Sequence, residues 1–432
     1  MKPSSLTGHT LEALALVLAG RRPADAVIGE FFRARRYLGS ADRRFIAESS
    51  YGVLRHYRFL EALALRALGR PDGSPVEPVA LVAAREAAAT DADPETIAQA
   101  IDDRWSVGGK GCAEFVRAVR AGASCAAALP RAVRHSIPDF VAGEWEGRFP
   151  PAEAEALCEA SNAQPPLALR VNTLKGDVAS CARALEAEGI VPSPGTLSPV
   201  ALVLPRRVNT LALASFRGGL FEMQDEGSQL IAPLLEAEPG MTVLDACAGG
   251  GGKSLHLAAL MENRGEVRAL DVDRGRLENL RLRARRAGAG IVHSVLLRRG
   301  SPPPGAGAFD AVLIDAPCSG TGTFRRNPWA KRTCTPAYAA SLAVRQAELL
   351  RLYAPSVKRG GRLVYATCTL LEAENGRVVK EFLASRPDFS LLSAGDLLAR
   401  RGIRFPGAGP TLELFPHRTG TDGYFAAVMV RA

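Results

Sequence analysis

The spacing of apolar residues divides the first half of the chain into two regions. From the start to about residue 140, apolar residues recur at helical spacing. Turn-forming residues break this pattern at 21–23, 69–75 and 105–111. From 141 to about 222 the texture is mixed, and we expect strands over 166–172 and 200–205 with a helix over 177–188. The pattern predicts an all-helical domain over 1–140, then a small α/β module over 141–222.

A third pattern begins near residue 223 and continues to residue 432. Short apolar strands alternate there with helical stretches, and the predicted strands cover 241–246, 267–272, 311–317, 361–368 and 424–431. Strands that alternate with helices imply parallel crossovers and a doubly wound sheet. We therefore predict an α/β protein whose third domain, over 223–432, contains a Rossmann-like sheet. The sequence has no internal repeat, and its one low-complexity segment is a short loop at 301–309.

Polar residues that can carry chemistry stand where these predicted strands end. They are Asp245, Asp271, Asp315, Cys318 and Cys368. Ligands of open α/β sheets bind outside the carboxyl ends of the strands. One crevice is therefore expected to contain all five residues.

Composition narrows the class of protein. A hydrophobic content of 47% with 23% charged residues is ordinary for a soluble globular protein. The apolar run at 11–20 is too short to span a membrane, and no signal peptide is visible, so a cytoplasmic protein without a membrane partner is expected. The 8 cysteines and 6 histidines are scattered, with no C-x-x-C pair, which argues against a disulfide framework and against a metal site.

The charge is basic, with 54 Lys and Arg against 45 Asp and Glu, a formal net charge of +9. Basic residues cluster at 31–36, 280–286 and 324–332. Clustered arginine beside aromatic residues suits a phosphate backbone and stacked bases. A solvated face made arginine-rich by a GC-rich genome explains the same clusters about equally well, so charge alone leaves both interpretations open.

The stretch DACAGGGGKS, residues 245–254, follows a predicted strand and opens a predicted helix. Glycines let the backbone approach a ligand, and a helix start offers free N–H groups. The spacing fits neither a P-loop nor G-x-G-x-x-G, so a nucleotide-like ligand and a structural tight turn both remain possible. Asp271, which ends the next strand, is placed to accept hydrogen bonds from ribose hydroxyls. S-adenosylmethionine fits this pattern better than NAD, while helix capping, the alternative role for Asp271, suits Asp273 better.

The two cysteines suggest chemistry on a pyrimidine ring. A thiolate that adds to carbon 6 makes carbon 5 nucleophilic enough to accept a methyl group. A second thiol can then assist the elimination that releases the enzyme. Asp315 can accept a hydrogen bond from a cytosine amino group and, when protonated, donate to the ring nitrogen. A small buried apolar residue is the alternative for either cysteine alone, but two such cysteines at one crevice are much less expected.

At these residues the sequence resembles the RsmB-like (Fmu/Sun) family of RNA cytosine-carbon-5 methyltransferases. DAPCSGTGTFRRNP at 315–328 resembles the family's proline-cysteine motif, YATCTLLEAEN at 365–375 its threonine-cysteine motif, and DACAGGGGKS its cofactor loop. The resemblance extends to PPLALRVN, FEMQDEGSQ and GTDGYF, and covers residues 140–432. Upstream, residues 38–56 are similar to the helical NusB-like domain of bacterial members, which implies an RNA-contacting or ribosome-contacting domain over 1–140.

The resemblance implies a role for each candidate residue. Cys368 is the implied nucleophile and Cys318 the thiol that helps to release the product, with Asp315 supporting the ring. The implied cofactor is S-adenosylmethionine, bound by Cys247, Ala248, Gly249, Gly250, Gly251, Gly252, Lys253, Asp271 and Asp315. Arg325 and Arg326 are expected to position phosphates. The expected substrate is ribosomal RNA or a ribosomal particle, with the protein acting as a monomer and without metal.

Two departures from the family pattern stand out. Gly250 occupies a position where members usually have proline, and residues 293–305 offer no acid where members usually carry one on the adenine side. The second departure leaves a non-catalytic ribosome-assembly factor as an alternative. A DNA cytosine methyltransferase is a further alternative, although it would use a proline-cysteine nucleophile without the threonine-cysteine partner.

Overall fold

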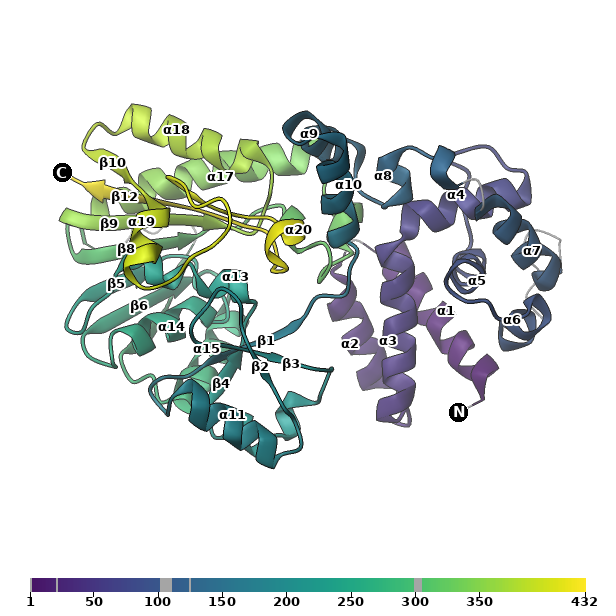
Figure 1. Cartoon of the computed structure of the whole chain (residues 1–432), viewed down its shortest axis with the longest axis horizontal. Helices are drawn as coiled ribbons and strands as arrows, with labels where there is room; N and C mark the ends of the chain where they lie inside the picture. Colours follow the sequence, from purple (N-terminus) through teal and green to yellow (C-terminus); the bar gives the residue numbers. More distant parts are fainter. Residues whose placement is uncertain (1, 21, 102–110, 124–125, 299–304) are drawn as a thin grey trace. The chain divides into compact units, whose positions relative to one another are not determined.

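The computed structural model describes residues 2–20, 22–101, 111–123, 126–298 and 305–432. The chain forms two compact units (Figure 1). Unit 1 comprises Met1–Ala163 and Phe324–Thr335, and unit 2 comprises Gln164–Thr323 and Pro336–Ala432. The predicted break lies outside the described residues at 105–110, the low-complexity loop at 301–304, and the acid-free stretch at 299–304. The boundaries proposed at 140 and 222 stay a prediction.

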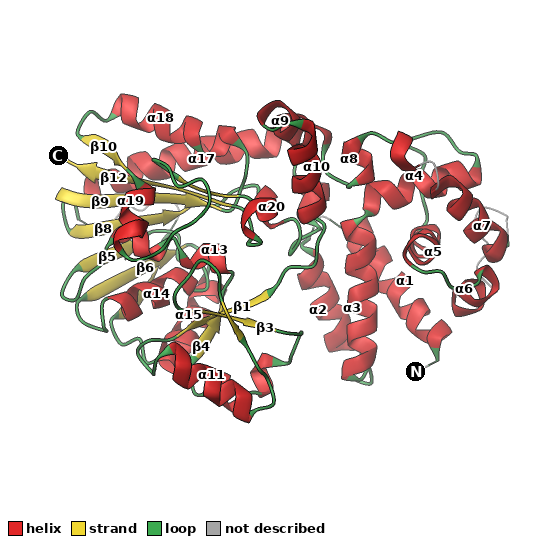
Figure 2. Ribbon diagram, viewed as in Figure 1, coloured by secondary structure: helices red, strands yellow, loops and turns green. Residues whose placement is uncertain are grey.

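Unit 1 is helical, as the apolar spacing predicts (Figure 2). Its helices are α1 Pro3–Ala19, α2 Ala24–Ala34, α3 Ser40–Arg55, α4 Tyr57–Leu68, α5 Pro78–Ala89, α6 Pro94–Ile101, α7 Cys112–Ala123, η1 Ala126–Ala128, α8 Arg131–Arg134, α9 Asp139–Arg148, α10 Pro151–Ala160 and α16 Ala330–Thr333. Prolines at the first turn start α1, α5 and α10, where a missing N–H costs nothing. Buried leucine, alanine and valine side chains form its core. Whether this unit is NusB-like stays a prediction.

The segment Phe324–Thr335 belongs to unit 1 although it begins inside the motif at 315–328 that contains Cys318. Trp329 is buried in the core of the helical unit. The Lys331 ammonium donates to the carbonyls of Arg55 (3.0 Å) and His135 (3.3 Å) and to Asn162 Oδ1. Burial holds the pKa of Lys331 well below its usual value. Part of the basic cluster at 324–332 is therefore structural.

Unit 2 begins with a four-stranded antiparallel sheet in the order β2-β3-β1-β4. Its elements are β1 Leu167–Val171, α11 Val178–Ala187, β2 Ser193–Pro194, β3 Ala201–Leu204, η2 Thr210–Ala212, α12 Ala214–Arg217 and β4 Phe221–Met223. Asp177 caps α11 by accepting a hydrogen bond from the Ser180 N–H at 2.7 Å. Both predicted strands and the predicted helix are confirmed. Strands β2 and β4 were not predicted, because two or three residues are too few to show alternation.

The rest of unit 2 is a larger sheet in the order β10-β12-β9-β8-β5-β6-β7, with β11 paired to β12. Its first half comprises α13 Glu226–Gln229, η3 Ala232–Leu235, β5 Thr242–Asp245, α14 Gly252–Leu260, β6 Glu266–Asp271, α15 Arg274–Ala287, β7 Val292–Leu296 and β8 Phe309–Asp315. Its second half comprises η4 Thr321–Thr323, α17 Pro336–Tyr353, η5 Ala354–Ser356, β9 Val357–Thr367, η6 Glu372–Glu374, α18 Gly376–Ser385, β10 Phe389–Leu392, α19 Ala394–Arg400, β11 Leu412–Leu414, α20 Pro416–Thr419 and β12 Tyr424–Arg431.

Strands β5 to β9 pair in parallel, which confirms the doubly wound sheet. The parallel orientation implied for the last strand is wrong. β12 pairs antiparallel with β9, β10 and β11, because the chain enters it from the adjacent β11 through a short connection that contains only the four-residue α20, too short for a crossover. Alternate side chains of the strands enter two different cores, such as Val243 in one and Leu244 in the other. Helices cover both faces of the sheet (Figure 2).

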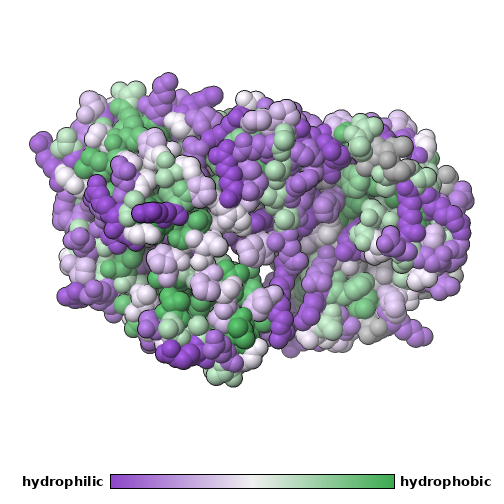
Figure 3. All heavy atoms as spheres, in the orientation of Figure 1, coloured by the Kyte–Doolittle hydropathy of each residue, from purple (hydrophilic) through white to green (hydrophobic). Residues whose placement is uncertain are grey.

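The visible surface is mostly hydrophilic, with smaller apolar patches between the polar residues (Figure 3). None of the helices in the described residues combines the length and the apolar character needed to cross a membrane.

The small sheet is fixed to the larger one by a buried ion cluster. Glu222 on β4, nearly inaccessible to solvent, pairs with Arg283 and Arg286 of α15, at 3.0 Å from Arg283. Asn172 donates to the carbonyls of Gly219 and Ala287, both at 2.8 Å. These contacts hold β4 against α15. Arg283 also donates to the Gly250 carbonyl at 2.5 Å, so the junction lies beside the glycine-rich loop.

We expect Glu222→Gln to destabilise unit 2 by about 3 kcal/mol, because two arginines lose the carboxylate that compensates their burial. Hydrogen–deuterium exchange of peptides from β5 to α15, measured in increasing urea, gives the midpoint for this unit. Tryptophan fluorescence serves as an internal reference, because all 3 tryptophans, at positions 105, 145 and 329, fall within the ranges of unit 1.

Glu262→Gln is the matched control. Its ion pair with Arg264 is more than 60% exposed on both sides, so the expected loss is below about 0.5 kcal/mol. Equal midpoints for the two variants would show that the Glu222 cluster does not stabilise the junction.

Candidate active site

The glycine-rich loop joins the end of β5, at Asp245, to the start of α14, at Gly252. Gly249 (φ +54°) and Gly251 (φ +81°) have left-handed backbones, which glycine adopts without strain. A side chain at Gly251 would lie 2.6 Å from Leu280 of α15, so the loop packs closely on that helix. At Gly249 a β carbon would meet none of the described atoms within 4 Å. The loop therefore leaves open space on the side where a ligand can approach.

Asp271, at the end of β6, is bonded to this loop. Its Oδ2 accepts from the Gly249 N–H and its Oδ1 from the Asp273 N–H, both at 2.8 Å. Asp273 caps α15 by accepting from the Arg276 N–H at 3.0 Å, as the sequence predicts. A carboxylate beside open glycine backbone and a helix N-terminus is a set of groups that fits an adenosine ligand with its two ribose hydroxyls. Within the same loop, burial raises the pKa of Cys247, so its thiol stays neutral.

Lys253, in the first turn of α14, pairs with Asp315 at the end of β8, with 2.5 Å between Nζ and Oδ2. Burial lowers the pKa of Lys253, but the nearby Asp315, Asp245 and Cys368 outweigh this effect, so its pKa lies above the ordinary value. Burial also raises the pKa of Asp245 to about 7, although Ser254 donates a hydrogen bond to it at 2.6 Å. Lys253 thus carries a positive charge next to Asp315 and Cys368.

The two cysteines of the predicted motifs meet in space. Cys318 follows β8 and Cys368 follows β9, and these strands pair in parallel with Asp315 opposite Ala366. Their sulfur atoms are 3.3 Å apart, and the Cys368 N–H donates to the Cys318 sulfur at 3.3 Å. The hydrogen bond with Cys368, together with burial, raises the pKa of Cys318 well above its usual value. Cys318 is therefore a neutral thiol at neutral pH, within reach of Cys368.

Sequence reasoning missed two buried side chains at this site. Glu374 accepts hydrogen bonds from the residue after Cys318, and Gln346 of α17 donates to the Pro317 carbonyl at 2.9 Å. Glu374 lies inside the quoted motif YATCTLLEAEN, so its place in the sequence was a signal that could have identified it. Gln346 gives no such signal, because it is one of several polar residues in α17 and lies outside both quoted cysteine motifs.

Arg325 and Arg326 differ in accessibility. Arg325 is 4% exposed, whereas the neighbouring Arg326 is exposed. Both belong to unit 1 together with the rest of Phe324–Thr335. Of the two arginines, Arg326 is thus the one whose side chain solvent reaches.

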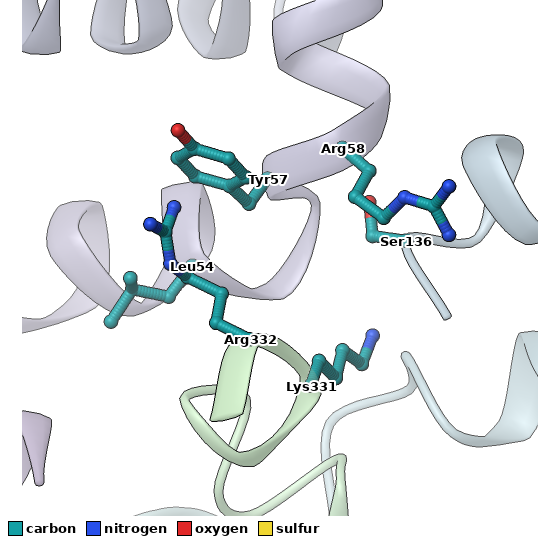
Figure 4. Close-up of a pocket in the computed structure, with 6 residues that line it drawn as sticks. All are labelled: Leu54, Tyr57, Arg58, Ser136, Lys331 and Arg332. Carbon is teal, nitrogen blue, oxygen red and sulfur yellow. The ribbon is translucent and has the colours of Figure 1, made fainter. Parts of the chain in front are cut away.

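Unit 1 contains a cavity of about 210 Å³ of its own, whose lining residues Figure 4 shows: Leu54, Tyr57, Arg58, Ser136, Lys331 and Arg332. The Arg332 guanidinium lies 3.9 Å above the Tyr57 ring, and Arg58 forms two 2.9 Å hydrogen bonds with Asp139. With Lys331 held by three oxygens, each of the three basic side chains already contacts protein groups. The contact of Arg332 with the Tyr57 ring holds α16 against α4.

Family models match two regions of the chain. Residues 232–430 match the model described as 16S rRNA methyltransferase RsmB/F, and residues 137–210 match the ferredoxin-like domain of RsmF/B-like methyltransferases. The second match overlaps the small antiparallel sheet.

Curated relatives and solved structures agree with these models. The chain is 33% identical to a probable ribosomal RNA small subunit methyltransferase B of Bacillus subtilis over 99% of both chains. It is 34% identical to ribosomal RNA small subunit methyltransferase B of Pseudomonas putida over 73% of this chain and 71% of the relative. A methyltransferase homolog protein of Pyrococcus horikoshii matches with a TM-score of 0.59 and 26% identity, over 70% of this chain and 98% of that one.

A second protein of Pyrococcus horikoshii, NSun6, was solved with SFG. It is 22% identical and matches with a TM-score of 0.59, over 68% of this chain and 98% of that one. This likeness adds the shared fold. The identity to the Bacillus subtilis relative covers nearly the whole of both chains, and the chain belongs to the RsmB/F family of 16S rRNA methyltransferases.

Proposed function

We propose that the protein methylates carbon 5 of a cytosine in ribosomal RNA through a covalent adduct between Cys368 and carbon 6. The observation that carries this proposal is the 3.3 Å separation of two cysteine sulfurs at the ends of adjacent parallel strands. Membership of a 16S rRNA methyltransferase family supports the substrate class. The neighbouring Lys253 and Asp315 provide a charged pair beside the sulfurs.

S-adenosylmethionine is the cofactor, and when bound it supplies an electrophilic methyl group. The residues that would hold it are the loop Cys247 to Lys253 and Asp271, with Asp315 at the edge of the site. Support comes from the open space at Gly249 and from the carboxylate of Asp271 beside it. A structurally similar protein was solved with SFG, an analogue of this cofactor.

The residues of the chain act in sequence on the pyrimidine. The Cys368 thiolate forms a bond to carbon 6, and Asp315 hydrogen-bonds the cytosine amino group, which makes carbon 5 nucleophilic. After methylation the carbon 5 proton passes to water, and its electron pair restores the double bond between carbons 5 and 6. As this double bond forms, the bond from carbon 6 to sulfur breaks, and its electron pair returns to Cys368. The neutral thiol of Cys318, one hydrogen bond away, stabilises this departing thiolate.

The charged Arg326 side chain, which is exposed, is proposed to position an RNA phosphate, adding affinity more than base choice. Arg325 was expected to share this role, and its low exposure makes it the weaker candidate of the two.

The assignment of roles to the two cysteines predicts opposite outcomes for their alanine variants. After incubation with ribosomal RNA or ribosomal particles and methyl-labelled S-adenosylmethionine, Cys318→Ala should trap a labelled protein–RNA adduct on a denaturing gel, because elimination is blocked. Cys368→Ala should give neither adduct nor methylated RNA, because the nucleophile is gone.

Cys181→Ala is the control, because this cysteine lies on α11, buried in the core between that helix and the small sheet and outside the motifs. It should methylate RNA without trapping an adduct. Failure of the wild type and all variants to label either substrate would instead favour a ribosome-assembly factor, and faster labelling of DNA than of RNA would favour a DNA methyltransferase.

A target cytosine in a stable hairpin stem should react poorly compared with the same cytosine in a loop. Base stacking hides carbon 6 from Cys368, and extruding the base from a stem costs a few kcal/mol. Initial rates on matched stem and loop substrates measure the difference. Equal rates on both would refute attack on an unstacked base.

Asp271→Asn should weaken binding of S-adenosylmethionine about tenfold, measured by isothermal titration calorimetry. The variant loses the charge that accepts hydrogen bonds from Gly249 and, in the proposal, from the ribose. Asp273→Asn is the matched control, since asparagine caps a helix about as well as aspartate. Equal affinities for the two variants would contradict the assignment of Asp271 to the cofactor.

A further inference from the structure

The residues that follow Cys318 are hydrogen-bonded to the residues that follow Cys368. Ser319 Oγ and Thr369 Oγ1 are 2.8 Å apart, and Thr321 Oγ1 lies 2.9 Å from the same Thr369 oxygen. Backbone bonds accompany these contacts: the Gly322 N–H donates to the Cys368 carbonyl at 3.0 Å, and the Leu370 N–H donates to Thr321 Oγ1 at 2.8 Å. The two cysteine loops are thus joined side by side immediately after the sulfurs.

Glu374 lies at the centre of this network, with no solvent exposure. Its Oε2 accepts from the Ser319 N–H at 2.9 Å and from Gln346 Nε2 at 2.8 Å. Its Oε1 accepts from the hydroxyls of Ser319 and Thr369, at 3.2 Å for Thr369. All four partners donate, which is the arrangement that stabilises a buried carboxylate. One side chain therefore contacts the residue after Cys318 and the residue after Cys368.

Two neighbouring side chains hold the other sides of the cysteines. Gln346 Nε2 also donates to the Pro317 carbonyl at 2.9 Å, so Cys318 is fixed at both flanking residues. Asn375 accepts from the Thr367 hydroxyl at 2.6 Å and donates to the Thr369 carbonyl at 3.0 Å, so Cys368 is fixed in the same way. The Tyr365 hydroxyl donates to the Glu374 carbonyl at 2.6 Å and anchors the turn that carries both residues.

We propose that Glu374 is a positioning residue for Cys318 and Cys368. Together with Gln346 and Asn375 it holds the two sulfurs at hydrogen-bonding distance, 3.3 Å apart. This inference rests on the proposed function and adds a residue to it. Elimination needs the Cys318 thiol beside the departing Cys368 sulfur, and Glu374 maintains that separation. Glu374 contacts neither substrate nor cofactor, and it acts through the two loops to which it is hydrogen-bonded.

The first experiment measures sulfur proximity without methylation. Diamide takes two electrons and two protons from a pair of thiols, leaving a disulfide and the reduced hydrazine. Peptide mass mapping of the diamide-treated protein identifies the Cys318–Cys368 disulfide and its rate of formation. We expect Glu374→Ala to slow this rate at least about tenfold, since about 1.4 kcal/mol of lost positioning corresponds to that factor.

Two variants distinguish positioning from general destabilisation. Glu374→Gln should restore the rate to within about threefold of wild type, because the amide oxygen can replace Oε2 while the two hydroxyls turn to accept from the amide N–H groups. Glu372→Ala, at an exposed glutamate two residues earlier, should leave the rate unchanged. Should Glu374→Ala fail to fold, Thr369→Val removes the hydroxyl shared by both loops and is expected to slow disulfide formation in the same way.

The second experiment measures turnover on ribosomal RNA. Glu374→Ala should lower kcat and KM for RNA together, because slower elimination leaves a larger fraction of the enzyme as covalent adduct at steady state. A folded Glu374→Ala protein that forms the disulfide as fast as wild type would overturn the positioning role. The two proposals can fail separately. If Glu374→Ala forms the disulfide more slowly than wild type but the wild type does not methylate ribosomal RNA, the positioning role stands and the proposed function is refuted.

Discussion

The parallel pairing of β8 with β9 is the constraint on which the candidate active site depends. Parallel strands end at the same edge of a sheet, so residues that follow each strand by a similar number of positions become neighbours. Cys318 lies three residues after Asp315, and Cys368 lies two residues after Ala366, the partner of Asp315 in the register. A register shift of one residue would reverse the side-chain directions in β9 and separate the sulfurs.

Strand pairing alone does not bring two sulfurs to 3.3 Å, and the loops beyond the strands need their own support. That support is a buried carboxylate, which costs desolvation and is retained only where donors surround it. At Glu374 the donors are two N–H groups and two hydroxyls. Three of them belong to Ser319 and Thr369, one residue in each cysteine loop, and the fourth is Gln346 Nε2 of α17. The group that needs the most compensation is therefore the group that joins the loops. The buried ammonium of Lys253 is compensated in the same way, by its ion pair with the Asp315 carboxylate.

Much of this arrangement could be predicted from the sequence, because apolar runs mark the strands and polar residues mark their ends. Asp271, Cys318 and Cys368 were identified in this way, and the structure brings the two cysteines together as expected. The short strands β2 and β4 were not predicted, because tertiary contacts form them and their two or three residues are too few to show alternation of apolar and polar residues. The antiparallel entry of β12 escaped for a related reason, since a strand carries the same pattern in either direction. Gln346 could not be found at all, because only the folded chain places α17 against Pro317.

Gly322 anchors the loop after Cys318 within unit 2, just before the chain enters a segment of unit 1. Its N–H donates to the Cys368 carbonyl at 3.0 Å, and its carbonyl accepts from the Gly423 N–H at 2.8 Å. A β carbon at Gly322 would lie 2.3 Å from the Gly423 carbonyl, so only glycine allows this approach. The chain passes from this fixed point to Phe324, the first residue of the unit 1 segment, within two residues. Because Gly322 is bonded on both sides within unit 2, the geometry at Cys318 is set by β9 and by the turn before β12. Gly423 is thus part of the framework of the candidate active site, although it lies more than one hundred residues after Cys318.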